Sequence, residues 1–138
     1  MLLWGPRTGG HALRGPALAE LRAGGDVAAY GLPQHVHGLT WGDDGFAQFE
    51  KASIFVSGGT ALTLGWEFRD VWWLTGGTSS GLGMATANRR QIEPNVWAQS
   101  YNHGWIVCDH GLAECRYGLH MTVEQVRAQG TRVAIARR

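Results

Sequence analysis

Histidines are the side chains of this sequence best suited to acid–base or metal chemistry, because imidazole titrates near neutral pH and ligates transition metals. His35 and His37 are separated by one residue, so on an extended segment both imidazoles point to the same side. His103 lies in the second half of the chain. These three residues are the candidate general bases or metal ligands of a small metal- or histidine-dependent enzyme.

Cysteines and two further histidines follow at Cys108, His110, Cys115 and His120. Their spacing matches none of the usual paired zinc motifs, and the chain contains neither C-x-x-C nor H-E-x-x-H. Histidines hydrogen-bonded to the backbone are commoner than ligands, so we predict no metal and no cofactor. Cys108 and Cys115 flank a six-residue turn and could face each other across it, but in a cytoplasmic protein they would remain thiols.

An aromatic-rich stretch offers the best binding surface. If residues 96–108 form one continuous strand, alternation places five aromatic or polar side chains on a single face. Such a mixture resembles the lining of a small-molecule pocket, because polar atoms are costly to bury without partners. We add Trp66, from earlier in the chain, as a further wall of this pocket. The predicted ligand-binding residues are therefore Trp66, Trp97, Gln99, Tyr101, His103 and Trp105. The alternative is that the tryptophans fill a core or a subunit interface.

A glycine-rich segment, Gly76 to Gly83, carries a second candidate motif. Residues 77–81 have the G-x-S-x-G spacing that presents a serine in α/β-hydrolases, and the segment also resembles the glycine-rich loop of short-chain dehydrogenases. The dehydrogenase pattern is one residue shorter, and no acidic residue lies about twenty positions further on to bind a ribose. We therefore interpret the segment as a structural connection between a sheet and a helix.

Composition favours a globular protein and argues against several classes of function. Hydrophobic residues make up 44% and charged residues 17% of the 138 positions. The net charge of +1 gives no basic footprint for nucleic acid or an anionic membrane. No run of eighteen apolar residues would span a bilayer, and Met1 to Trp4 is too short for a signal-peptide core, which favours a cytoplasmic protein.

Alternating patterns place the candidate residues mainly on strands. Apolar and polar residues alternate over Thr60–Phe68, which predicts a half-buried strand. Gly58-Gly59 joins this strand to Ala52–Ser57, because paired glycines suit the tight turns of hairpins. The all-apolar run Val71–Thr75 would then be a third, more buried strand of the same meander.

Short helices complete the expected set of elements. We predict them over Pro16–Arg22, over Leu82–Ile92 and after Thr122, where Gln125 stands three residues later in the capping-box position. Further strands are expected over 96–108, where Asn102-His103-Gly104 could instead form a hairpin turn, over Arg116–Met121 and at the C-terminus.

Together these patterns predict the α+β class: one domain over residues 16–138, preceded by an irregular segment over residues 1–15. A curved, mainly antiparallel sheet, or a partly open barrel, would carry two or three short helices. The favoured function is binding of a small molecule in an aromatic-lined pocket, and the alternatives are the histidine-dependent enzyme and a structural or self-associating module. Expected partners are a small-molecule ligand and a second copy in a homodimer, with neither nucleic acid nor membrane.

Overall fold

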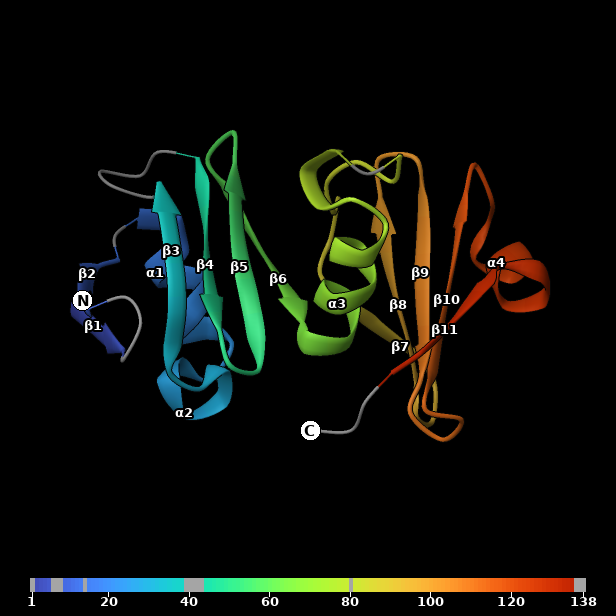
Figure 1. The fold of residues 1–138 in the computed structure, drawn as a ribbon, viewed down its shortest axis with the longest axis horizontal. Helices are drawn as coiled ribbons and strands as arrows, with labels where there is room; N and C mark the ends of the chain where they lie inside the picture. Colours follow the sequence, from blue (N-terminus) through green and yellow to red (C-terminus); the bar gives the residue numbers. More distant parts are fainter. Residues whose placement is uncertain (1, 6–8, 14, 39–43, 80, 136–138) are drawn as a thin grey trace. The chain divides into compact units, whose positions relative to one another are not determined.

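The structure, a computed structural model, describes residues 2–5, 9–13, 15–38, 44–79 and 81–135. The chain divides into two compact units, unit 1 (Met1–Trp66) and unit 2 (Glu67–Arg138). Figure 1 shows that each unit contains an open antiparallel sheet with short helices. The predicted α+β class with antiparallel sheets is therefore confirmed, but the strands form separate sheets. The single domain predicted for residues 16–138 stays a prediction.

Unit 1 is built on a four-stranded meander in the order β3-β4-β5-β6. Its strands are β3 (Pro33–Gly38), β4 (Gly45–Phe49), β5 (Ala52–Ser57) and β6 (Thr60–Gly65). The predicted hairpin between β5 and β6 is confirmed, with Ser57 paired to Thr60. Gly58 and Gly59 both have positive φ, +58° and +81°, which favours glycine at each turn position.

Helices α1 (Gly15–Ala23) and α2 (Asp26–Tyr30) precede this sheet, and α1 packs on β5 and β6. The core of unit 1 joins Leu13 and Leu21 to inward-facing residues of β4 and β5, among them Phe49 and Ile54. Strands β1 (Leu2–Gly5) and β2 (Gly9–Ala12) pair with each other within the N-terminal segment for which we expected no regular structure.

Unit 2 contains a five-stranded antiparallel sheet in the order β11-β10-β9-β8-β7. Its strands are β7 (Arg90–Glu93), β8 (Val96–Tyr101), β9 (Gly104–Asp109), β10 (Glu114–Leu119) and β11 (Thr131–Ala134). Helix α4 (Val123–Gln129) connects β10 to β11. The capping box is confirmed, because the Thr122 side chain accepts from the Gln125 N–H while the Gln125 side chain accepts from the Thr122 N–H.

Two predicted elements of unit 2 are wrong. The run Val71–Leu74 belongs to helix α3 (Trp66–Leu74) and not to a strand, so the predicted strand Thr60–Phe68 also ends early, at Gly65. Phe68 and Trp72 recur at helical spacing and are buried, whereas Trp73 and Leu74 are exposed. Residues 82–92 form no helix. After a 3-10 turn at Gly77–Ser79 (η2), Ala85 makes an isolated bridge to Tyr101, and the chain then enters β7 at Arg90.

A continuous strand over 96–108 is also wrong, but the hairpin alternative is confirmed, because the segment forms β8 and β9 joined at Asn102-His103. Alternation then assigns each side chain to one of two faces of the sheet. One face carries Trp97, Gln99 and Tyr101 with Cys108 and Cys115, as the pairing of the three strands shows. We call it the disulfide face, because the two cysteines are bonded to each other. The opposite, α4 face carries the buried cluster of Val96, Ala98 and Val107, against which Val126 of α4 packs.

Candidate functional site

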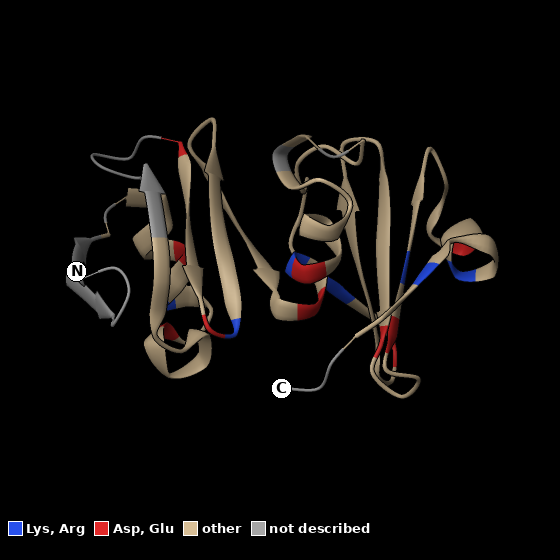
Figure 2. Ribbon diagram, in the orientation of Figure 1, with Lys and Arg blue, Asp and Glu red and all other residues tan. Residues whose placement is uncertain are grey.

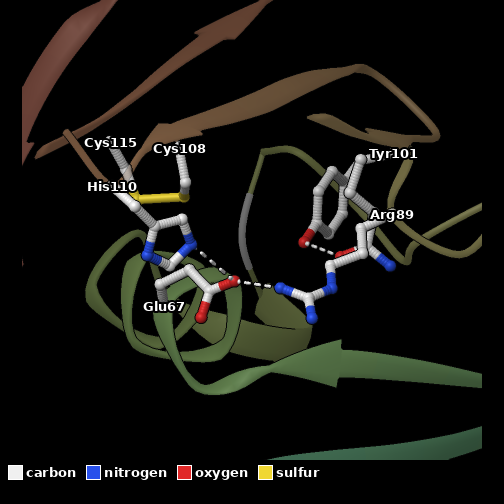
Figure 3. The surroundings of a disulfide bond; sticks show 7 residues. Glu67, Arg89, Tyr101, Cys108, His110 and Cys115 are labelled. Carbon is white, nitrogen blue, oxygen red and sulfur yellow. Dashed lines mark hydrogen bonds and ion pairs between the residues drawn. A yellow bond between two sulfur atoms is a disulfide. The ribbon is translucent and has the colours of Figure 1, made fainter. Parts of the chain in front are cut away.

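A buried carboxylate on α3 organises the disulfide face of unit 2. The Glu67 side chain is 1% exposed, and its Oε1 accepts a hydrogen bond of 2.7 Å from Arg89 Nη1. The same oxygen lies 3.7 Å from His110 Nε2. Figure 3 shows the three side chains converging beside the disulfide. Partners of this kind are needed because an isolated buried carboxylate is strongly destabilising.

Arg89 and His110 connect this carboxylate to solvent. Their side chains are 40% and 35% exposed, respectively. The Arg89 guanidinium also lies 4.6 Å from the ring centroid of Trp97, within the range of a cation–π interaction. A half-exposed imidazole beside a buried carboxylate has the geometry of a general acid–base site, because the carboxylate can orient the ring while the ring still reaches solvent.

Tyr101 and Gln99 continue the polar interior of the same face. The Tyr101 hydroxyl donates to Gln99 Oε1 at 3.1 Å, and Gln99 Nε2 donates to the Ala87 carbonyl at 2.9 Å. Burial raises the pKa of Tyr101 well above its usual value, and the negative charge of Glu67 raises this pKa further. Tyr101 is therefore a neutral hydrogen-bond donor at neutral pH.

Cys108 and Cys115 form a disulfide, which corrects the expectation of free thiols. The two residues are directly opposite each other in β9 and β10, and both are fully buried. Directly opposed residues of an antiparallel pair hold their Cβ atoms close together, so the register itself brings the two sulfur atoms within bonding reach. The sequence placed the two cysteines across one turn, and the structure bears out that geometry.

A surface pocket of about 180 Å³ lies on the other side of the sheet, the α4 face. Its apolar wall is made by Val96, Val107 and Leu112, from β8, β9 and the turn before β10. Four charged residues complete the lining, and they are Asp109, Glu114, Arg116 and Arg127. Figure 2 shows the acidic positions at the end of β9 and the beginning of β10, with basic positions on β10 and α4.

The acidic side of this pocket is held by the turn between β9 and β10. Asp109 Oδ1 accepts hydrogen bonds from the Gly111 and Leu112 N–H groups, at 2.8 and 3.1 Å. Glu114 is paired with Asp109 in the strand register, so the two carboxylates lie on one face as close neighbours. Glu114 Oε1 also lies 3.5 Å from Arg116 Nε, which offsets part of their mutual repulsion.

The basic side combines a strand residue with a helix residue. Arg116 Nη1 donates to the Arg127 carbonyl at the end of α4, a favourable position for a cation because helix C-termini carry partial negative charge. The Arg127 guanidinium donates to Glu93 Oε1 at 2.8 Å. This hydrogen bond lowers the pKa of Glu93 and raises that of Arg127, so both groups stay ionised around neutral pH.

The structure brings together only some of the predicted ligand-binding residues. Trp97, Gln99 and Tyr101 share the disulfide face, but Gln99 and Tyr101 are buried and bonded to each other. Trp105 lies on the α4 face, packed against its apolar cluster. The exposed His103 occupies the β8–β9 turn, with its ring 5.8 Å from that of His120. Trp66 falls in unit 1, at the first residue of α3.

The predicted catalytic histidines do not form one site. His35 is an exposed residue of β3 in unit 1, its ring 5.5 Å from that of Phe46, whereas His103 belongs to unit 2. The side chain of His37 lies outside the described part of the structure. Among the described residues, no group of three or more histidine, cysteine, aspartate or glutamate side chains is placed to hold a metal ion. In that same part of the chain, none of the helices has the length and apolar character needed to cross a membrane.

Sequence reasoning missed Glu67, Arg89, Arg116 and Arg127. The strand predicted over Thr60–Phe68 placed Glu67 on a solvated face, but in a helix Glu67 and Val71 stand four residues apart on the buried side. A test for helical spacing in residues 66–74 could have found this burial, whereas no local signal shows that Arg89 reaches Glu67.

The chain matches no known protein family model, and no curated protein matches it. The site is therefore interpreted from its own chemistry alone.

Proposed function

We propose that unit 2 binds a small molecule and that the ligand occupies the pocket on the α4 face. The observation that carries this proposal is the lining itself, an apolar wall bordered by four charged side chains. Ligand sites commonly combine apolar walls with a few convergent polar groups. The sequence predicted a small-molecule pocket with aromatic walls, whereas this lining combines two valines and a leucine with charged side chains.

The floor of the pocket is formed by two valines of the buried cluster on the α4 face. Val96 and Val107 are each only 5% exposed, and both belong to the buried cluster that α4 covers. Trp105 packs against this cluster, although it does not line the pocket. A ligand resting on the two valines would therefore alter the surroundings of the Trp105 indole.

Intrinsic fluorescence tests the proposal during a screen of small metabolites. A ligand in the pocket should shift the emission of the wild-type protein and of Trp97→Phe, because Trp97 lies on the disulfide face. The shift should disappear in Trp105→Phe. A ligand whose signal is lost in Trp97→Phe and kept in Trp105→Phe would place binding on the wrong side of the sheet.

A blocking variant provides an independent readout by calorimetry. Leu112 lines the pocket and is 67% exposed, so Leu112→Trp fills the pocket without disturbing a packed core. We expect the affinity for any ligand of the pocket to fall at least about tenfold. Leu32→Trp, at another exposed leucine in unit 1, is the matched control. Equal affinities of the two variants would refute the assignment.

The enzyme alternative is supported by one specific observation, the approach of His110 Nε2 to the buried carboxylate of Glu67. In this reading His110, in place of the predicted His35, His37 or His103, is the general base. If a screen finds hydrolytic activity, His110→Gln should reduce kcat by about 100-fold or more, while exposed His120→Gln should leave kcat unchanged. Equal losses in both variants would remove this alternative.

The homodimer and the cytoplasmic location stay predictions. Sedimentation across a dilution series tests the first. Thiol titration of protein isolated from its natural compartment tests the second, because disulfides rarely persist in a reducing cytosol.

A further inference from the structure

From the charges around the pocket on the α4 face, we infer that its ligand is a small zwitterion, with an ammonium group, a carboxylate and a short apolar side chain. This inference rests on the proposed function and names the ligand class. Two acidic and two basic side chains line the pocket, so their formal charges cancel. A balanced lining favours neither a simple cation nor a simple anion, but it can bind both ends of a dipolar molecule.

The acidic side can receive the ammonium group. Asp109 Oδ1 is occupied by two backbone N–H groups, which fixes the orientation of the carboxylate. The hydrogen bonds of Asp109 in the described part of the chain all use Oδ1, and its charge also attracts the Arg127 guanidinium across the pocket. Glu114 lies directly opposite on β10, so an ammonium group between the two carboxylates would relieve their repulsion.

The basic side can receive the carboxylate. Arg127 uses one guanidinium nitrogen for Glu93, and Arg116 uses two nitrogens for Glu114 and the Arg127 carbonyl. A guanidinium carries five N–H donors, so both arginines keep donors for which the described residues supply no acceptor. Arginine donors bind carboxylates with directional, charge-assisted hydrogen bonds.

The apolar wall of the pocket determines which side chain the ligand can carry. Val96, Val107 and Leu112 can cover a branched aliphatic side chain, and a pocket of about 180 Å³ limits its size. An α-amino acid such as valine has all three groups around one carbon atom.

Calorimetry with a matched set of compounds tests the inference on the full chain. The set is valine, 3-methylbutanoate, which lacks the ammonium group, and 2-methylpropylamine, which lacks the carboxylate. We expect valine to bind about 10- to 100-fold more tightly than either, because each missing end loses charge-assisted hydrogen bonds. Equal binding of the acid or the amine would overturn the inference.

Two variants assign the ends of the ligand. Asp109→Asn retains the Oδ1 acceptor of the turn, and Arg127→Gln retains the main-chain carbonyl that Arg116 contacts. Asp109→Asn should weaken valine at least about tenfold but leave the acid unchanged, and Arg127→Gln should weaken valine but leave the amine unchanged. Glu50→Gln and Arg22→Gln, both in unit 1, are charge-matched controls and should bind valine normally.

The outcomes separate this inference from the proposal beneath it. If valine does not bind, but another compound binds with an affinity that Leu112→Trp reduces, the inferred ligand class is wrong while the assignment of the binding pocket remains supported. If no compound of any class binds in a Leu112-dependent manner, both fail.

Discussion

The interiors of the two units differ in chemistry although both cover an antiparallel sheet with short helices. In unit 1 the cluster around Leu13, Leu21, Phe49 and Ile54 is mainly apolar, and its Tyr30 hydroxyl forms a hydrogen bond with Thr63. On the disulfide face of unit 2, the Glu67 and Gln99 side chains are only 0–1% exposed. The first interior is stabilised mainly by the removal of apolar surface from water, and the second depends on specific polar partners.

This difference indicates where the molecule can hold functional groups in fixed positions. Apolar packing is nondirectional, so such a core tolerates substitutions that conserve volume. A buried hydrogen-bonded network fixes the orientation of each member, because an unpaired polar atom there is costly. Unit 2 is accordingly the better candidate for recognition chemistry, and the comparison can be tested by breaking each interior in turn.

The largest effect is expected in the apolar interior. Phe49 is fully buried, with its ring 5.5 Å from that of Tyr30, so Phe49→Ala leaves a cavity. We expect a loss of about 3–5 kcal/mol in the free energy of unfolding, measured by urea denaturation. Leu32→Ala, at an exposed position of the same unit, should change this free energy by less than about 0.5 kcal/mol.

The same denaturation curves test the predicted single domain. If residues 16–138 fold as one domain, Phe49→Ala shifts a single transition that all probes report together. Two transitions, of which Phe49→Ala moves only one, would contradict the prediction and show that the units unfold separately. A loss below about 1 kcal/mol would instead contradict the account of the apolar core.

A smaller effect is expected from the polar interior. Glu67→Gln removes the charge that Arg89 and His110 share, and we expect a loss of about 1–3 kcal/mol. The estimate is lower than for a fully buried pair because Arg89 is 40% exposed. Combining Glu67→Gln with Arg89→Gln in a double-mutant cycle isolates their interaction, and strictly additive losses would show that no such coupling exists.

The smallest effect depends on pH. The pKa of Tyr101 is raised in the folded protein, so its contribution to stability is fully present below the unfolded pKa of about 10 and is lost as the pH rises toward the folded value. Tyr101→Phe should cost about 1 kcal/mol at about pH 7, where it loses the hydrogen bond to Gln99. Denaturation at rising pH should show a shallower alkaline decline for the variant, and parallel declines would contradict the burial of a neutral phenol.

Features fixed by adjacent residues could be predicted from the sequence. The Gly58-Gly59 turn and the Thr122–Gln125 capping box depend on backbone conformation and short contacts within a few positions, and both are confirmed. The antiparallel character of the sheets was predicted for the same reason, since short turns between alternating segments join neighbouring strands.

Features fixed by distant residues could not be predicted in this way. Residues 82–89 are held by β8 and the turn after it rather than by a local helix, as the hydrogen bonds from the Thr86 N–H to the Ser100 carbonyl and from the Met84 N–H to Asn102 Oδ1 show. The sequence offered a hairpin turn at Asn102-His103-Gly104 as one of two interpretations of residues 96–108, but the pairing of β8 with β9 decides between them and places Trp105 on the face opposite Gln99. The candidate pocket therefore had no signal in the sequence, because its lining joins strands and a helix whose pairing is nonlocal.

The disulfide has a consequence for the pocket on the reverse side of the sheet. Cys108 lies between Val107 and Asp109, and Cys115 lies between Glu114 and Arg116, so each cysteine is flanked by pocket residues. Since neighbours along a strand project to opposite sides, the covalent link fixes the spacing of these four side chains without occupying any of the space between them. Ligand preference can therefore change by substitution on one surface while the crosslink on the other preserves the alignment of the strands.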